Sequence, residues 1–180
     1  MRNIILRKYL CKRLAEYYSQ PADNVVGSIG NNIGSGSSSP RINFSSLLNE
    51  WHWKYTYRQV YKEQNGMWLT PVELFFPYYS NVLANFVSES MSATLNNTGD
   101  GDHFDIVELG GGRGTNAMAL LNHLRTCHTD MYEKLNSYTI YDTSTTLHEL
   151  QRQVLIDESC IHSDKVKLVN IDMMDISEGK

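Results

Sequence analysis

The sequence of 180 residues predicts an α/β fold, with an N-terminal helical region followed by the first half of an open parallel sheet. Three observations lead to this prediction. Helical spacing of apolar residues dominates residues 1–95, short apolar runs alternate with helical patterns over residues 96–180, and the first of these runs leads into a cluster of glycines. We therefore expect a helical region over 1–95 and a ligand-binding α/β half-domain over 96–180.

Composition and charge exclude several classes of protein. Apolar residues make up 41% of the chain and charged residues 20%, which is typical of a folded globular protein. No apolar run is long enough to span a membrane, and a net charge of −4 disfavours electrostatic binding of nucleic acid. Cys11, Cys127 and Cys160 form no C-x-x-C pair, so neither a disulfide framework nor a cysteine-based metal site is expected.

The first fifteen residues are strongly basic and contain no acidic residue, with positive charges at Arg2, Arg7, Lys8, Lys12 and Arg13. Such a composition is typical of a mitochondrial transit segment. It also fits a folded first helix, because Leu6, Leu10, Leu14 and Tyr17 recur at helical spacing, and we favour this second interpretation. A transit segment would indicate a mitochondrial protein, whereas a simple folded helix is compatible with the cytoplasm.

The remainder of the first region combines a polar loop with helical segments. Residues 27–40 are rich in Gly, Ser and Asn and are expected to form a flexible loop. Thr70 to Glu73 then form a capping box, with a threonine N-cap, a proline at the first helical position and a glutamate three residues after the cap. Between these two segments one helix face is predicted from Leu47, Leu48, Trp51 and Tyr55.

After a polar break at residues 96–103 the apolar pattern becomes that of buried strands separated by helices. The three predicted strands are 104–109, 138–141 and 166–171, and the two helices between them cover 117–135 and 146–155. This order implies right-handed parallel crossovers. A complete doubly wound sheet contains two such halves, so we expect a half-domain truncated at its C-terminus.

A glycine-rich run connects the first predicted strand to the helix that follows it. The run reads Glu108-Leu109-Gly110-Gly111-Gly112-Arg113-Gly114-Thr115, and its glycines allow a tight turn and the close approach of a ligand to the backbone. It lacks the lysine of a P-loop. Counted from Gly112, it matches only the looser G-x-G-x-x-A form of a nicotinamide fingerprint, which leaves an NAD-dependent oxidoreductase as an alternative.

The acid before the glycines indicates which ligand the loop binds. Glu108, Gly110, Gly112 and Gly114 follow the spacing acid-x-Gly-x-Gly-x-Gly. A carboxylate at this strand end would repel a pyrophosphate and attract an ammonium or sulfonium group. S-adenosylmethionine carries both cationic groups and is the predicted cofactor, although Glu108 could instead bond only to neighbouring backbone donors.

Two further acidic residues follow the second and third predicted strands. Asp142 ends the second strand, where its two carboxylate oxygens can accept both hydroxyls of a ribose. It could instead cap the next helix at Thr143 or Ser144. Asp172 lies just after the third strand, where it could reach an adenine amino group. Asp175 is equally well placed for this role.

Three stretches of the chain resemble the MidA-like family of S-adenosylmethionine-dependent methyltransferases: 68–75, 107–115 and 138–144 followed by Leu147 and Gln151. The likeness covers only the N-terminal part of the family's length, and Asp142 stands where the family often has Glu. The resemblance implies a class I methyltransferase (Rossmann-like) fold. It also implies a type II protein arginine methyltransferase that makes symmetric dimethylarginine on a subunit of respiratory complex I, during assembly of that complex in mitochondria.

Methyl transfer from a sulfonium requires mainly that the enzyme align the two reactants in a site that excludes water. A guanidine acceptor would also need a carboxylate, and Glu73 is the one substrate-side candidate, although its place in the capping box favours a structural role. We assign no catalytic residue. We expect no metal site, because His123 and Cys127 share a helix face without a third ligand. A non-catalytic assembly module that keeps the cofactor fold is the other alternative.

Overall fold

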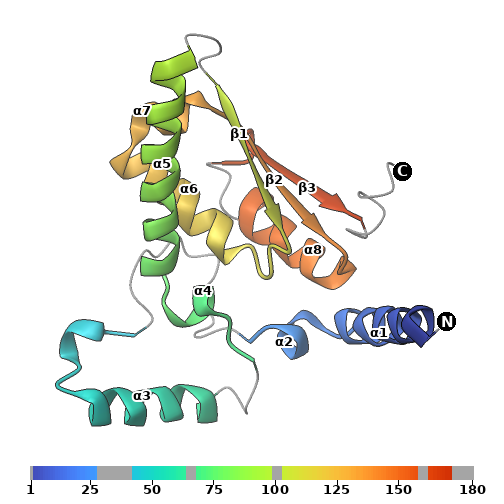
Figure 1. Ribbon diagram of the computed structural model, residues 1–180. Coiled ribbons are helices and arrows are strands. Elements are labelled where there is room, and N and C mark those ends of the chain that lie inside the picture. Colours follow the sequence, from blue (N-terminus) through green and yellow to red (C-terminus); the bar gives the residue numbers. More distant parts are fainter. Residues whose placement is uncertain (1, 28–41, 64–67, 99–102, 158–161, 172–180) are drawn as a thin grey trace.

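The structure is a computed structural model that describes residues 2–27, 42–63, 68–98, 103–157 and 162–171 (Figure 1). Its strands are β1 (Phe104–Leu109), β2 (Leu135–Asp142) and β3 (Val166–Asn170). Its helices are α1 (Arg2–Tyr18), α2 (Ala22–Val25), α3 (Glu50–Glu63), α4 (Pro71–Leu74), α5 (Tyr78–Thr98), α6 (Thr115–Cys127), α7 (Thr129–Lys134) and α8 (Thr145–Arg152). A 3-10 turn covers Phe44–Ser46, and a π-helical turn follows α8 over Gln153–Asp157.

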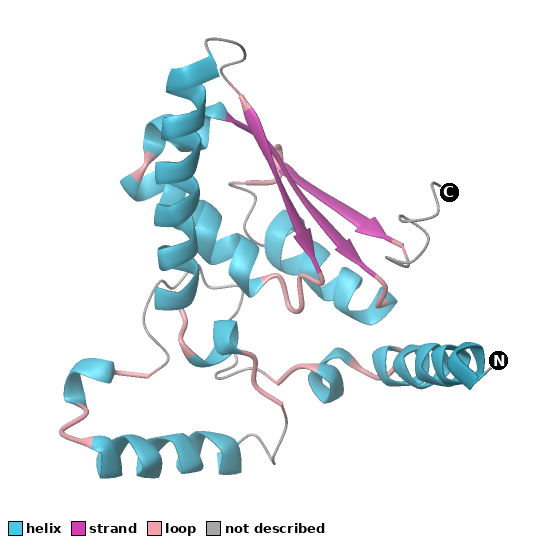
Figure 2. Ribbon diagram, viewed as in Figure 1, coloured by secondary structure: helices cyan, strands magenta, loops and turns pink. Residues whose placement is uncertain are grey.

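The three strands form one parallel sheet in the order β1-β2-β3, which confirms the predicted α/β fold. Glu108 pairs with Ile140, and Asp142 pairs with Asn170. Backbone bonds continue the pairing past the strand ends, from Gly110 N to Tyr141 O (2.8 Å) and from Ile171 N to Asp142 O (3.0 Å). All three strands point with their carboxyl ends toward the N-terminal helices, so the glycine loop and the end of β2 share one edge of the sheet (Figures 1 and 2).

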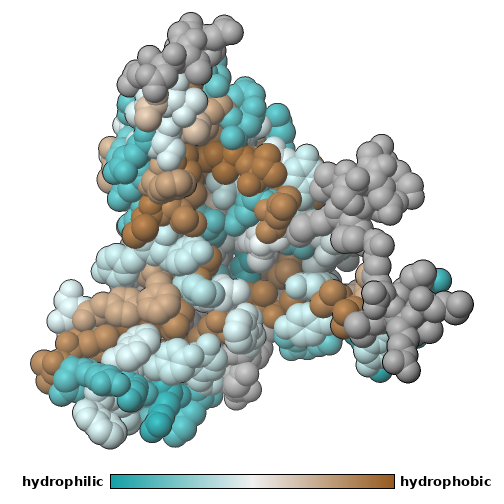
Figure 3. Space-filling model, in the orientation of Figure 1, coloured by the Kyte–Doolittle hydropathy of each residue, from teal (hydrophilic) through white to brown (hydrophobic). Residues whose placement is uncertain are grey.

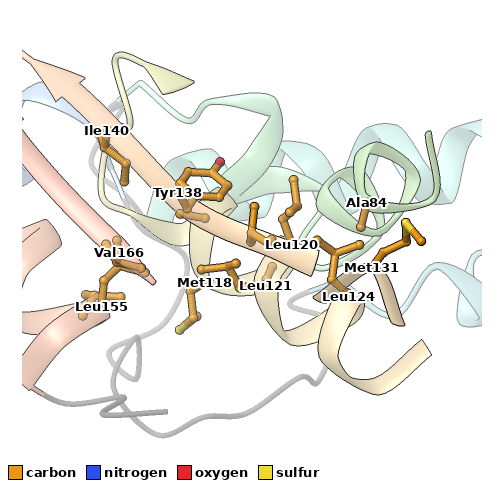
Figure 4. Packing of buried hydrophobic residues seen from close by; sticks show 14 of the residues in the cluster. Ala84, Met118, Leu120, Leu121, Leu124, Met131, Tyr138, Ile140, Leu155 and Val166 are labelled. Atoms are coloured by element: carbon orange, nitrogen blue, oxygen red, sulfur yellow. The ribbon is translucent and has the colours of Figure 1, made fainter. Parts of the chain in front are cut away.

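The main core fills the space between the sheet, helices α5, α6 and α7, and the π-helical turn that follows α8 (Figure 4). Alternation along β2 turns Tyr138 and Ile140 toward the helices, where their side chains are 1% and 0% exposed. From α6, Leu120, Leu121 and Leu124 join the same cluster, and Leu124 lies beside Ala84 and Met131. On the other face of the sheet, Val107 and Leu109 are 59% and 62% exposed, so the described part of the chain covers β1 on one face only.

The helix expected over 117–135 is two helices and the start of a strand. α6 ends at Cys127, α7 begins at Thr129, and His128 between them has the non-helical angles φ −139° and ψ 57°. The ring of His128 bonds to α5 instead, with Nδ1 accepting from Ser88 Oγ (3.0 Å) and Nε2 donating to Asn85 Oδ1 (2.8 Å). A tertiary contact therefore interrupts a pattern that reads as continuous in the sequence.

Helices α1 and α3 form in the expected parts of the chain, but Leu47 and Leu48 of the predicted face precede α3, and the remaining predicted apolar faces are not buried in the described chain. On α1, Leu10 and Leu14 are about half exposed. On α3, Trp51 is 80% exposed, while Trp53 on another side packs with Phe44 and Phe75. Hydrophobic surface is also visible around the α3 region, although tryptophan and tyrosine themselves are pale on the hydropathy scale of Figure 3. The aromatic residues of α3 occupy more than one side of the helix, so spacing alone could not select the packed side.

Two further expectations concern the polar segments. The loop expected over 27–40 lies outside the described residues, apart from Gly27. α5 continues to Thr98, so the expected boundary between 95 and 96 falls inside a helix, and the division of the chain into 1–95 and 96–180 stays a prediction. No helix in the described ranges is both long enough and apolar enough to cross a membrane.

Burial of α6 against the sheet should dominate the stability of the fold. Leu121 is 0% exposed, so Leu121→Ala should lower the free energy of unfolding by about 2–5 kcal/mol through lost burial and a cavity. Leu48→Ala, at a residue that is 85% exposed, should change it by less than about 0.5 kcal/mol. Urea unfolding followed by circular dichroism measures both values, and equal losses for the two variants would contradict this packing.

A buried histidine ties the segment before β3 to helices α6 and α7. The His162 side chain is 1% exposed, its Nδ1 accepts from the Tyr132 hydroxyl (2.8 Å), and its Nε2 donates to Asn122 Oδ1 (3.1 Å). Burial lowers the pKa of His162 to about 4, and the positive charge of Arg125 acts in the same direction. The neutral ring is therefore the form that the fold holds at neutral pH.

This histidine predicts a loss of stability in acid. Because the pKa of His162 falls from 6.5 to about 4 on folding, the unfolded chain binds the proton more readily between these values. Its contribution to stability is present above about pH 6.5 and is lost as the pH falls toward about 4. Urea unfolding across this range should show a steeper loss for the wild type than for His162→Gln. Parallel pH profiles for the two proteins would show that His162 does not have the lowered pKa.

Candidate functional site

A cleft of about 410 Å³ lies at the carboxyl edge of the sheet, between the glycine loop and the N-terminal helical region. One wall comes from the α/β part of the chain: Gly110, Gly112, Asp142, Thr143 and Leu147. The opposite wall comes from the end of α1, the end of α2 with the residue after it, and the segment before α4: Tyr17, Tyr18, Val25, Val26, Trp68 and Thr70. Segments far apart in the sequence therefore form one site.

The glycines of the loop have different roles in this arrangement. Gly110, Gly112 and Gly114 all have positive φ, of 75°, 54° and 81°. A Cβ atom on Gly112 would meet nothing within 4 Å, so the backbone at this position borders open space. A Cβ on Gly111 would lie 2.5 Å from Ile140 Cγ2, which explains why the loop can pack so closely on β2. Gly114 does not line the cleft but forms the N-cap of α6.

The carboxylate of Asp142 lines the cleft and is held by two donors. Its Oδ1 accepts from Ser144 N (3.0 Å) and its Oδ2 accepts from Gln151 Nε2 (2.9 Å), and the residue is only 4% exposed. The cap of α8 is Ser144, whose hydroxyl accepts from Leu147 N (3.2 Å). Asp142 thus supports the turn before α8 and also faces the cleft. Each oxygen keeps a further lone pair with which it can accept a ligand hydroxyl.

Glu108 does not line the cleft but points toward the helices behind the glycine loop. Its Oε1 accepts from Asn116 Nδ2 (2.8 Å) and its Oε2 accepts from the Tyr138 hydroxyl (2.9 Å). Burial raises the pKa of Glu108, while these two hydrogen bonds oppose the rise and the negative charge of Asp142 adds to it. Burial and the nearby Glu108 carboxylate also raise the pKa of Tyr138. The partners of Glu108 are therefore side chains, not the local backbone donors considered from the sequence.

Glu73 lies at the junction of α4 and α6. Its carboxylate is 1% exposed and accepts a hydrogen bond from Thr115 Oγ1 in the first turn of α6. Thr70 caps α4 as predicted, because its hydroxyl accepts from Glu73 N (3.4 Å). Thr70 lines the cleft and Glu73 does not, so the structure places Glu73 behind the cleft wall.

The N-terminal wall is attached to the α/β part by hydrogen bonds to backbone carbonyls. Ser144 Oγ donates to Tyr18 O (2.8 Å), Thr146 Oγ1 to Gln20 O (3.0 Å), and Arg113 Nη1 of the glycine loop to Val26 O (3.0 Å). Sequence reasoning missed this wall. The bonds end on carbonyl groups, which every residue has, so no side-chain pattern in the N-terminal segment signals them.

Two further expectations from the sequence concern the acids after the third strand and a metal site. Asp172, and with it Asp175, lies outside the described residues. Within the described ranges no group of three or more His, Cys, Asp or Glu side chains could hold a metal ion. His123 bonds through its ring to Asn85 on α5 (2.9 Å).

The chemistry of the cleft fits a nucleoside cofactor with a cationic end. Its volume falls within the range of about 300–1,000 Å³ that is typical of small-molecule sites. Asp142 offers acceptors for hydroxyl groups, Gly112 allows close approach to the backbone, and Val25, Val26 and Leu147 supply apolar contact. The two acids at this edge, partly buried Glu108 and buried Asp142, favour a positively charged ligand group.

The match to a protein family agrees with this chemistry. The family Methyltransf_28, described as "Putative S-adenosyl-L-methionine-dependent methyltransferase", matches residues 82–177. Among solved structures, the chain is similar to a COG1565 superfamily member from Burkholderia thailandensis bound to S-adenosyl-homocysteine, with 25% identity and a TM-score of 0.47. That similarity covers 61% of this chain and 25% of the other, so the chain spans about a quarter of that protein's length.

No match is found among the curated proteins. The family match covers more than half of the chain, and its cofactor is the one that the glycine loop predicts. The chain therefore belongs to the Methyltransf_28 family of S-adenosylmethionine-dependent methyltransferases.

Proposed function

We propose that the cleft binds S-adenosylmethionine and that the chain forms the cofactor-binding part of a protein methyltransferase directed at arginine. The observation that carries the proposal is the position of Asp142 and Gly112 on one wall of a single cleft, joined through Gln151. Asp142 would accept the ribose hydroxyls, and the backbone of Gly110 and Gly112 would lie against the amino acid part of the cofactor. Nothing in the comparisons supports the NAD-dependent alternative.

Glu108 and Asp172 complete the proposed set of cofactor-binding residues. Glu108 would act through its charge behind the glycine turn, since its oxygens already accept from Asn116 and Tyr138. Both hydrogen bonds stabilise the ionised form of Glu108, which is the form that attracts a cation. For Asp172 we keep the role predicted from the sequence, contact with the adenine amino group.

When bound, the cofactor supplies a methyl group on a sulfonium. The chain's own contribution is alignment and exclusion of water. Val25, Val26 and Leu147 give the cleft apolar sides, and the hydrogen bonds to Tyr18, Gln20 and Val26 carbonyls hold the N-terminal wall in place. We propose that Glu73 supports the substrate side of this wall through Thr115 and do not assign it a contact with the acceptor.

The resemblance of 68–75, 107–115 and 138–144 to the MidA-like family supports three further parts of the proposal. These are the arginine specificity, the symmetric dimethylation and a complex I subunit as substrate. A mitochondrial location is supported by the same resemblance and by the basic N-terminus. A methylation assay with peptides that contain either arginine or lysine tests the proposal. Transfer to arginine alone supports it, while cofactor binding without transfer supports the non-catalytic assembly module.

Binding of the cofactor should stabilise the chain in a manner that depends on Asp142. S-adenosylmethionine at about 100 times its dissociation constant should add about 2.7 kcal/mol to the free energy of unfolding, and NAD should add none. Asp142→Ala should lose most of this gain, because the ribose hydroxyls lose their acceptor. Asp130→Asn, at an exposed residue of α7, is the matched control and should retain the gain. Thermal melts with each ligand measure the shift, and equal shifts with NAD would contradict the assignment.

Substitutions in the glycine loop should separate binding from stability. Gly112→Ala puts a methyl group into the open space at the cleft and forces alanine to φ +54°, so it should weaken cofactor binding by about tenfold or more. Gly111→Ala drives a methyl group into Ile140 and should lower stability by about 1–3 kcal/mol. Isothermal titration and urea unfolding distinguish the two effects. A Gly112→Ala protein with unchanged affinity would show that the cofactor does not approach this backbone.

A further inference from the structure

We propose that Gln151 is a positioning residue for the cofactor, because its side-chain amide locks the glycine loop to the carboxylate of Asp142. The residue lies on α8, outside the glycine loop and outside the cleft lining. The inference rests on the proposed function, since its role is to hold the two groups that would contact the cofactor.

The geometry uses both hydrogens of a single nitrogen. Gln151 Nε2 lies 2.9 Å from Gly112 O and 2.9 Å from Asp142 Oδ2, and both of these atoms are acceptors. An amide NH₂ group has two donors, so this nitrogen is fully used. The amide orientation is set by these partners, because the opposite orientation would put an oxygen against two oxygens. The side chain is 0% exposed, so water does not compete for the two bonds.

The two acceptors belong to different parts of the cleft wall. Gly112 follows β1 and has a left-handed backbone with open space at its Cα, whereas Asp142 ends β2. Through Gln151 the loop carbonyl and the carboxylate are held at a set separation. With Ser144 N on its other oxygen, the carboxylate of Asp142 is restrained at both oxygens.

The Gln151 side chain also lowers folding stability, so its presence is not explained by stability. Gln151 Oε1 is buried and has no hydrogen-bond partner among the described residues. A buried acceptor without a donor has lost its hydrogen bonds to water and so lowers the stability of the fold. An apolar side chain of similar length would avoid this cost but could not donate to Gly112 and Asp142. The chain therefore keeps a side chain whose benefit lies in the position of its two partners.

The test is Gln151→Glu, which preserves shape and replaces the donor nitrogen by oxygen. At about pH 8 the new carboxylate would face Asp142 and the carbonyl of Gly112, and the affinity for S-adenosylmethionine should fall by about tenfold or more. Toward about pH 5.5 one of the two carboxyl groups takes up a proton and a donor returns between them. The ratio of the variant's dissociation constant to that of the wild type should then fall to about threefold or less.

Two further variants complete the experiment. Gln151→Met removes both donors without adding charge, so it should bind weakly at every pH. Gln153→Glu adds the same charge at an exposed residue two positions along and should match the wild type. Other titratable and charged groups lie on the elements around Gln151 and are present in both proteins. Dividing the variant's dissociation constant by that of the wild type at each pH therefore removes their contribution. These groups are Glu108, Arg113, Tyr138, His148, Glu149, Arg152 and Lys167. Isothermal titration gives the dissociation constants, and circular dichroism at each pH verifies folding.

The outcomes separate this inference from the proposed function. Wild type that fails to bind S-adenosylmethionine would overturn the proposed function and, with it, the role of Gln151. Wild type that binds, together with a Gln151→Glu ratio that does not change with pH, would overturn the role of Gln151 alone. If Gln151→Glu does not fold at the higher pH, Gln151→Met decides, and wild-type affinity in that variant overturns the inference.

Discussion

Parallel pairing of β1 with β2 places the two chemical parts of the site together. The loop after β1 and the acid at the end of β2 are about thirty residues apart in sequence, and the crossover through α6 and α7 brings both to the same edge of the sheet. The pairing persists because Tyr138 and Ile140 are buried against α6. A one-residue slip in register would turn these side chains away from the core, so the core that stabilises the fold also maintains the site.

Two acidic side chains close to each other give the site its electrostatic character. Asp142 and Glu108 each accept two hydrogen bonds, and the charge of Asp142 contributes to the raised pKa of Glu108. Burial of two carboxylates costs free energy unless donors or a cation compensate for it. The donors come from α6, β2 and α8, and a cationic ligand would add to their effect. The packing of the sheet edge thus supports the binding of a positively charged cofactor that we propose.

The N-terminal helical region is part of the same site. All six residues of its cleft wall precede residue 82, where the match to the methyltransferase family begins. This wall is joined to the glycine loop by Arg113 and to the start of α8 by Ser144 and Thr146. Because these bonds end on backbone carbonyls, the wall depends on the path of the chain more than on the identity of its residues.

The sequence by itself determined the succession of strands and helices along the chain, the parallel α/β class, the glycine loop and the acid at the end of β2, since these depend on short-range patterns of apolar, glycine and charged residues. The tertiary structure alone decided which faces of α1 and α3 are exposed, where His128 interrupts the helix, and that Glu108 and Glu73 point away from the cleft. It also revealed the contacts of Gln151 and the N-terminal wall. These features depend on contacts between residues distant in sequence, whose partners no local pattern identifies.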